Sequence, residues 1–146
     1  MNATPEQIKD VLTKYKRIAV VGLSPNEERP SNGVTRYMIR KGYDVVGVNP
    51  GHESILGQPC YISVLDVPGQ IEIVNVFRNS SAVPEVVDHC IEMKAKVIWL
   101  QEGVTHAEAE EKASKAGMIV ISDKCILKEH RKYIPHDSGP DKSQAV

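Results

Sequence analysis

Polar residues and glycine follow each of five short apolar runs, and their types suit the binding of an anion. They are Gly22, Leu23 and Ser24 after the first run, Asn49 and Pro50 after the second, Phe77 and Arg78 at the third, Gln101, Glu102 and Gly103 after the fourth, and Cys125 behind the fifth. Backbone N–H groups and basic side chains bind phosphates. Arg29 and Arg78 are therefore candidate charge partners, and Gly22 allows a ligand to approach the backbone closely. Loops require the same residue types, so position alone leaves a structural role open beside the predicted site for a phosphate-bearing nucleotide cofactor.

The first of these loops argues against the commonest nucleotide-binding motifs. A dinucleotide-binding turn has the pattern G-x-G-x-x-G, whereas this chain has a single glycine in Gly22-Leu23-Ser24-Pro25-Asn26-Glu27. Asn49 stands where NAD-binding proteins carry a ribose-binding acid at the end of the second strand. The G-K-[ST] signature of a P-loop is also missing after Gly22. These features disfavour NAD(P) and ATP in their commonest binding modes without excluding them.

The apolar runs alternate with amphipathic stretches, which predicts strands joined by helices. The expected strands are Ile18–Val21, Asp44–Val48, Ile71–Phe77, Val97–Leu100 and Met118–Ile121. The expected helices begin at Pro5 after a Thr4 cap, at Ser31, at Pro84, after a Thr105 cap and near Asp123. Strands separated by helices pair in parallel with right-handed crossovers. We therefore predict an α/β fold: a single doubly wound Rossmann-like domain over residues 1–134, with a five-stranded, mainly parallel sheet flanked by helices.

One segment breaks this rhythm. The stretch Gly51–Gly69 is expected to be a loop with a short helical turn rather than a crossover helix. The tail at residues 135–146 contains Pro, Ser, Gly and Asp and few apolar residues, and we expect it to be disordered.

Composition narrows the class of protein. The chain has 146 residues, 41% hydrophobic and 25% charged residues and a net charge of -1, which fits one globular domain without a nucleic-acid or membrane bias. The polar N-terminus is unlike a secretory signal, and no apolar run approaches the ~20 residues that span a bilayer. Three cysteines without a C-x-x-C pair argue against a disulfide framework or a structural zinc site. These features predict a cytoplasmic protein.

Five motifs taken together carry a family resemblance. They are Ile18-Ala19-Val20-Val21-Gly22-Leu23-Ser24, Val46-Gly47-Val48-Asn49-Pro50, Leu56-Gly57-Gln58-Pro59-Cys60-Tyr61, Trp99-Leu100-Gln101-Glu102-Gly103 and Asp123-Lys124-Cys125. With these motifs the chain resembles the small CoA-binding proteins of bacteria and archaea, and through them the N-terminal CoA-binding domain of the succinyl-CoA synthetase α subunit. The resemblance covers almost everything from Arg17 to Tyr133.

The resemblance implies a role for each candidate residue. Gly22, Leu23 and Ser24, with Arg29 nearby, correspond to the pyrophosphate cradle. Val48, Asn49 and Pro50 correspond to the adenine and ribose side, whereas Phe77, Arg78 and Ser81 correspond to one wall of the groove. Gln101, Glu102 and Gly103 correspond to the contact after the fourth strand. Cys125 matches an Asn-Cys-Pro turn of the synthetase, although Lys124 and Ile126 replace its neighbours here.

The implied function is reversible binding of coenzyme A or acyl-CoA without evident catalytic machinery. The synthetase's phosphorylated histidine belongs to a later domain, and the five histidines of this chain are interpreted as surface or packing residues. The alternatives are an NAD(P)-binding oxidoreductase or a partial acyl-CoA ligase acting with a partner subunit, and a regulatory module that senses acyl-CoA or thiol redox state. A homodimer or another protein partner stays open.

Single residues also have two interpretations. Cys125 is either a redox thiol beside the pantetheine thiol, which would form a mixed disulfide with CoA, or a small buried residue. Cys90 and Trp99 are both expected in the core.

Overall fold

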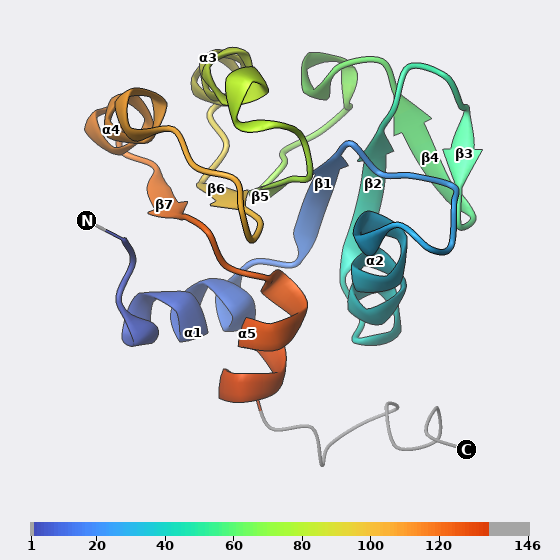
Figure 1. The fold of residues 1–146 in the computed structure, drawn as a ribbon, viewed down its shortest axis with the longest axis horizontal. Helices are drawn as coiled ribbons and strands as arrows, with labels where there is room; N and C mark the ends of the chain where they lie inside the picture. The colour runs from blue at the N-terminus through green and yellow to red at the C-terminus, as the bar shows by residue number, and fades with distance from the viewer. Residues whose placement is uncertain (1, 135–146) are drawn as a thin grey trace.

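The computed structural model describes residues 2–134, which fold around one sheet (Figure 1). The strand order is β3-β4-β2-β1-β5-β6-β7. All neighbours pair in parallel except β3 and β4. The strands are β1 (Arg17–Val21), β2 (Asp44–Val48), β3 (Ser54–Ile55), β4 (Gln58–Tyr61), β5 (Ile73–Val76), β6 (Val97–Leu100) and β7 (Ile119–Ile121). The expected Rossmann-like α/β fold with a mostly parallel sheet is confirmed.

The sheet has seven strands, so the predicted number of five is wrong. The two additional strands, β3 and β4, form a hairpin inside the segment that was expected to be a loop. Leu56 and Gly57 have φ angles of 55° and 75° and make its turn, and Cys60 of β4 pairs with Gly47 of β2. Strands this short carry no alternating pattern. The expected helical turn is present as the 3-10 helix η1 (Val64–Asp66).

The five expected α-helices are present with small shifts of their ends. They are α1 (Pro5–Lys14), α2 (Pro30–Arg40), α3 (Val83–Met93), α4 (Ala107–Lys115) and α5 (Ile126–Tyr133). Thr4 caps α1 in a capping box with Gln7, as expected. The predicted Thr105 cap of α4 is wrong, because His106 Nδ1 accepts the hydrogen bond from Ala109 N instead. No helix among residues 2–134 is long and apolar enough to span a membrane.

The helices cover both faces of the sheet, as the doubly wound fold requires. One buried cluster lies between the sheet and α3 and α4, with Val87, Cys90 and Ala113 at its centre. The other lies between the sheet and α1, α2 and α5, with Leu12, Met38 and Trp99. Figure 1 shows these two groups of helices apart from each other. Cys90 and Trp99 are both 0% exposed, which confirms their core positions.

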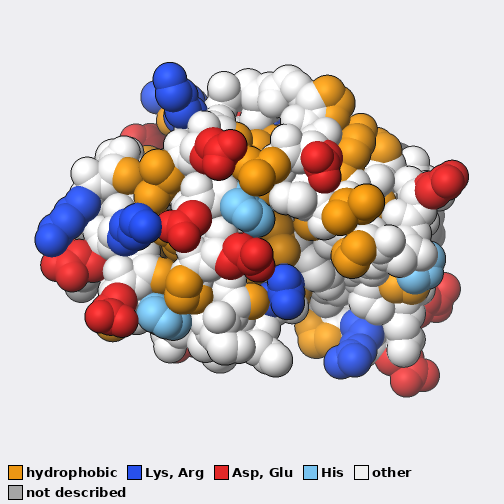
Figure 2. Space-filling model, turned by 90° about the horizontal axis from the view of Figure 1, so that it is seen from above, with side chains coloured by type: hydrophobic (Ala, Val, Ile, Leu, Met, Phe, Trp, Pro, Cys, Tyr) orange, Lys and Arg blue, Asp and Glu red, His pale blue; other side chains and the backbone are white. Residues whose placement is uncertain are grey.

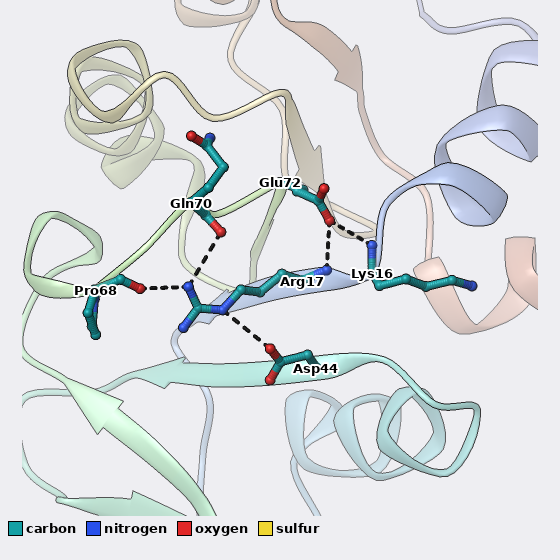
Figure 3. Close-up of polar contacts among 6 residues, drawn as sticks. All are labelled: Lys16, Arg17, Asp44, Pro68, Gln70 and Glu72. Carbon is teal, nitrogen blue, oxygen red and sulfur yellow. Dashed lines mark hydrogen bonds and ion pairs between the residues drawn. The ribbon is translucent and has the colours of Figure 1, made fainter.

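Polar groups tie the amino-terminal end of β1 to its neighbours (Figure 3). The Glu72 carboxylate accepts hydrogen bonds from the backbone N–H groups of Lys16 and Arg17 at 2.8 and 3.0 Å. The Arg17 guanidinium donates to the carbonyl oxygens of Pro68 and Gln70 and lies 3.4 Å from Asp44 Oδ2. We call these residues the amino-end cluster. The charged groups of Arg17 and Glu72 bind other groups of the same chain, which indicates a structural role for the cluster.

Strand order reverses at β1. The chain passes from β1 to β2 on one side and later returns as β5 on the other. In open parallel sheets, ligands bind beyond the carboxyl ends of the strands at such a switch point. The ends of β1 and β5, at Gly22 and Phe77, are therefore the first place to look for a site.

Candidate functional site

Two adjoining clefts open at the carboxyl ends of the strands. The first has a volume of about 620 Å³, and the residues that line it are Gly22, Ser24, Arg29, Pro30, Ser31, Val34, Phe77, Arg78, Asn79, Gln101, Glu102, Val104 and Cys125. The second has a volume of about 410 Å³, and the residues that line it are Val21, Gly22, Leu23, Ser24, Val48, Asn49, Pro50, Ile62 and Arg78. Figure 2 looks down on this end and shows apolar side chains exposed among charged ones. Gly22, Ser24 and Arg78 belong to both clefts and form the junction between them.

Gly22 allows the backbones of β1 and β5 to meet at this junction. Its φ is +89°, a value that side-chain-bearing residues rarely adopt. A Cβ atom there would lie 3.0 Å from Phe77 O and 3.1 Å from Arg78 Cγ. Its N–H donates to Val48 O of β2 at 3.0 Å. Any larger residue would push into the junction, so glycine is required for both its conformation and its size.

The loop from Ser24 to Arg29 is held by its own polar groups. Ser24 N donates to Ser31 Oγ at 3.0 Å, and Asn32 Nδ2 donates to Ser24 O at 2.9 Å. Ser24 Oγ accepts from Asn26 N, and Asn26 Oδ1 accepts from Glu28 N. Ser31 and Asn32 are buried in the first turn of α2. These bonds hold the loop in one conformation without a ligand. The Ser24 N–H already donates to Ser31 Oγ.

The start of α2 offers positive charge to the first cleft. Among the described residues no side chain caps this helix, whose N-cap position is Arg29. The helix dipole favours an anion at this end, although Pro30 has no N–H group and the Asn32 N–H already donates to Arg29 O. The guanidinium groups of Arg29 and Arg78 make no ion pair within residues 2–134. These two cations are exposed at the clefts and are available for an anionic ligand.

The second cleft is organised by Asn49. Its Nδ2 donates to Leu23 O at 2.9 Å and its Oδ1 accepts from Gly51 N at 2.8 Å. The side chain thus connects the loops after β1 and β2. Val48, Pro50 and Ile62 form the apolar part of this cleft, and Ile62 is 72% exposed. An exposed isoleucine beside a half-polar cleft suits a flat apolar ligand group.

The far end of the first cleft lies between β6 and α5. Lys128 Nζ lies 3.0 Å from Glu102 Oε2, and this hydrogen-bonded pair raises the pKa of Lys128. Asp123, in the left-handed region with φ 57°, accepts a hydrogen bond from Gly103 N at 2.7 Å. Trp99 Nε1 donates to Lys124 O at 2.9 Å. These bonds fix the turn that places Cys125 against the cleft.

The three cysteines have different surroundings, and all are free thiols. Cys125 is 9% exposed and lines the first cleft, which is compatible with both of its interpretations. Burial raises the pKa of Cys90 to about 12. Burial also raises the pKa of Cys60, which lies against Gly47 and lines neither of the two clefts.

Most of the sequence-predicted residues come together at the clefts. The first cleft has eight of them at its wall, namely Gly22, Ser24, Arg29, Phe77, Arg78, Gln101, Glu102 and Cys125. The second adds Leu23, Val48, Asn49 and Pro50. Ser81 and Gly103 line neither cleft. Ser81 lies in the 3-10 helix η2 (Ser80–Ala82). The Gly103 N–H donates a hydrogen bond to Asp123 Oδ1.

The structure adds cleft residues that sequence reasoning missed. Ser31 and Val34 come from the first turns of α2, and Ile62 follows β4. The Pro30 helix start was a usable signal for Ser31, because anions bind at helix N-termini. Ile62 required the β3–β4 hairpin, which the sequence pattern did not predict. No group of His, Cys, Asp and Glu side chains within the described part of the chain is arranged to hold a metal ion.

Comparison with known proteins places this chain in a family. A family model described as a CoA binding domain matches residues 16–131. The uncharacterised protein YneT of Bacillus subtilis is 40% identical over 129 residues, which cover 88% of this chain and 96% of YneT. A solved structure of a hypothetical protein from Pyrococcus horikoshii is 43% identical, with a TM-score of 0.88, and the match covers 91% of this chain and 94% of that one.

A longer enzyme also contains a similar region. The ADP-forming acetate–CoA ligase I of Archaeoglobus fulgidus is 28% identical over 121 residues, which are 76% of this chain but only 18% of the ligase. The family match covers all the residues that line the two clefts. This chain therefore belongs to the CoA-binding domain family.

Proposed function

We propose that this protein binds coenzyme A or an acyl-CoA reversibly in the two adjoining clefts. The observation that carries the proposal is the junction, where two clefts meet at a close-approach glycine and at an arginine without an ion pair among residues 2–134, in a chain of the CoA-binding domain family. Both volumes lie within the roughly 300–1,000 Å³ typical of ligand sites.

The arrangement suits a ligand with charge in its middle and different groups at its ends. CoA has a pyrophosphate between an adenosine part and a pantetheine arm. Arg78 lines both clefts, so its guanidinium can pair with the pyrophosphate wherever the ligand crosses the junction. Arg29 and the uncapped N-terminus of α2 add positive charge on the side of the first cleft.

The two ends of the ligand then occupy different clefts. Val48, Pro50 and Ile62 offer apolar contact for the adenine in the second cleft. The pantetheine arm lies along Phe77 and Gln101 in the first cleft, with its thiol directed toward Cys125. The chain's own residues bind and orient the ligand, and we propose no reaction for it.

Isothermal titration tests this proposal. The protein is titrated with CoA, with acetyl-CoA and with NAD⁺ under the same conditions. We expect saturable binding of CoA and acetyl-CoA with one site per chain. Absence of heat with both CoA ligands, together with binding of NAD⁺, overturns the proposal in favour of a nicotinamide cofactor.

We also infer that the protein works in the cytoplasm. Its three cysteines are free thiols, and thiols persist in a reducing compartment. Fractionation of cells that express a tagged chain tests this inference, which fails if the protein is recovered outside the cytoplasm.

A further inference from the structure

Two buried amide side chains are hydrogen-bonded to each other, and one of them, Gln101, lines the first cleft. Asn75 is in the middle of β5 and is 1% exposed, and Gln101 follows the last residue of β6 and is 4% exposed. The neighbours of Asn75 along β5 are Val74 and Val76, both fully buried in the aliphatic core. Burying an amide costs free energy unless the hydrogen bonds it made to water are replaced. The amide groups of Asn75 and Gln101 therefore need hydrogen-bond partners.

The hydrogen bond between the two side chains orients the Gln101 amide. Gln101 Nε2 donates to Asn75 Oδ1 at 2.5 Å. The amide nitrogen is therefore directed to Asn75, and the carbonyl oxygen Oε1 is left as the outward group.

The surroundings show where Oε1 is accessible. No donor among residues 2–134 reaches this atom. The one side-chain polar atom of the described residues that is both fully buried and without a partner is Thr35 Oγ1. Gln101 Oε1 is therefore not fully buried, and Gln101 is one of the residues that line the first cleft. An accessible carbonyl oxygen of this kind can accept a hydrogen bond from a ligand N–H group.

We propose that Gln101 Oε1 accepts a hydrogen bond from an amide N–H of the pantetheine arm, with Asn75 as the positioning residue that sets the orientation of Gln101. This inference rests on the proposed function and deepens it. The arm carries two secondary amides, whereas the nucleotide part of CoA can be bound entirely at the junction and the second cleft. The Asn75–Gln101 pair therefore selects ligands with a pantetheine arm over bare adenine nucleotides. A site built around a hydrogen-bonded group discriminates against a ligand that lacks it.

The test compares CoA with its pantetheine-free nucleotide, which keeps all the phosphates of CoA but lacks the pantetheine arm. Binding of both ligands is measured by isothermal titration for the wild type and for Gln101→Met, which keeps the side-chain length but removes both the acceptor and the Nε2 donor to Asn75. We expect CoA to bind about tenfold more weakly to the variant, as for the loss of one buried hydrogen bond. Affinity for the pantetheine-free nucleotide should stay within about twofold. Gln70→Met is the matched control, because Gln70 lies near the opposite end of the sheet and donates to Ile71 O and Lys94 O.

A double-mutant cycle tests the role of Asn75. Asn75→Leu should lower the ratio of CoA affinity to nucleotide affinity in the wild-type background but leave it unchanged in the Gln101→Met background. A purely structural role for Asn75 would weaken both ligands alike in both backgrounds. Asn75→Ser replaces Asn75→Leu if thermal melting shows that the leucine variant is unfolded.

The outcomes separate this inference from the proposed function. If the wild type binds CoA but Gln101→Met weakens both ligands equally or neither, the selectivity role of Gln101 is wrong and CoA binding stands. If the wild type binds neither ligand, the proposed function itself is wrong.

Discussion

The two ends of the same sheet use their arginines in opposite ways. At the amino end, Arg17 is bonded to Pro68 O and Gln70 O and pairs with Asp44 (Figure 3). At the carboxyl end, Arg29 and Arg78 line clefts and have no ion pair within the described chain. The difference separates an arginine whose contacts lie within the fold from arginines at the clefts, where we propose that the ligand binds.

The glycines of the two ends differ in the same way. Gly69 has a positive φ, and a Cβ atom there would meet only the Arg17 side-chain end, at 2.8 Å from Nη1. At Gly22 a Cβ atom would meet backbone of the next strand. An added side chain at Gly22 would therefore meet less yielding neighbours than one at Gly69, so small changes in shape at the carboxyl end should alter binding.

The largest effect is expected at the junction. Arg78→Gln should lower the affinity for CoA by about ten- to a hundredfold, because a hydrogen bond to a charged group contributes roughly 1.5–3 kcal/mol. The melting temperature should change little, since Arg78 is exposed and unpaired within the described chain. Titration calorimetry and thermal melting measure the two quantities. If Arg78→Gln lowered the melting temperature but not the affinity for CoA, Arg78 would have a structural role like that of Arg17. That result would contradict the contrast between the two ends of the sheet.

Gly22→Ala should reduce both stability and affinity. The alanine must adopt a positive φ, which costs about 1 kcal/mol, and its methyl group crowds Phe77 O as well. Gly42→Ala is the matched control, since Gly42 has φ +93° and open space around its Cβ position. Denaturant unfolding should show a larger loss for Gly22→Ala, and only this variant should bind CoA more weakly. If the two variants lost equal amounts of stability and of CoA affinity, the junction would have no special role in binding.

Arg17→Gln should lower the free energy of unfolding by about 1–2 kcal/mol, because its bonds to Pro68 O and Gln70 O are lost. Its affinity for CoA should equal that of the wild type. Arg40→Gln, at the exposed end of α2, serves as the control and should stay within about 0.5 kcal/mol of the wild type. Urea unfolding with and without CoA checks both expectations, and weakened CoA binding by Arg17→Gln would contradict them.

The smallest effect concerns the thiols. At pH 8 the Cys90 thiol should stay unlabelled by iodoacetamide, since burial raises its pKa to about 12 and keeps it protonated. Because the pKa is raised in the folded state, Cys90 favours folding below the ordinary thiol pKa, and this contribution is lost as the pH rises toward 12. CoA should slow the labelling of Cys125, which lines the cleft, but not that of Cys60. Mass spectrometry of the labelled peptides distinguishes the three sites, and equal protection of Cys60 and Cys125 would place the ligand elsewhere.

The long strands and the gathering of most candidate residues at the clefts were predictable for a common reason. Runs such as Ile18–Val21 are buried on both faces, so their sequences are continuously apolar. Parallel pairing then brings the residues after those strands to one edge of the sheet, which is why Gly22, Arg78 and Gln101 meet.

The features that were missed depend on packing rather than on local pattern. The β3–β4 hairpin consists of strands of two and four residues, and Pro59 within β4 argues against a strand. Ile62 reaches the second cleft only because that hairpin is present. In the sequence, Asn75 is a single polar residue between two valines. Its hydrogen bond with Gln101 forms only because β5 and β6 are paired in the sheet.

The most direct test of the account is a map of where CoA binds. Isotope-labelled protein is titrated with CoA, and the backbone amide signals are followed by NMR. We predict that the largest shifts occur at Gly22, Arg78 and Gln101, whereas Arg17 and Glu72 of the amino-end cluster stay within the noise. Shifts concentrated at the amino-end cluster, or none at the junction under saturating CoA, would contradict the assignment of the ligand site to the carboxyl ends of the strands.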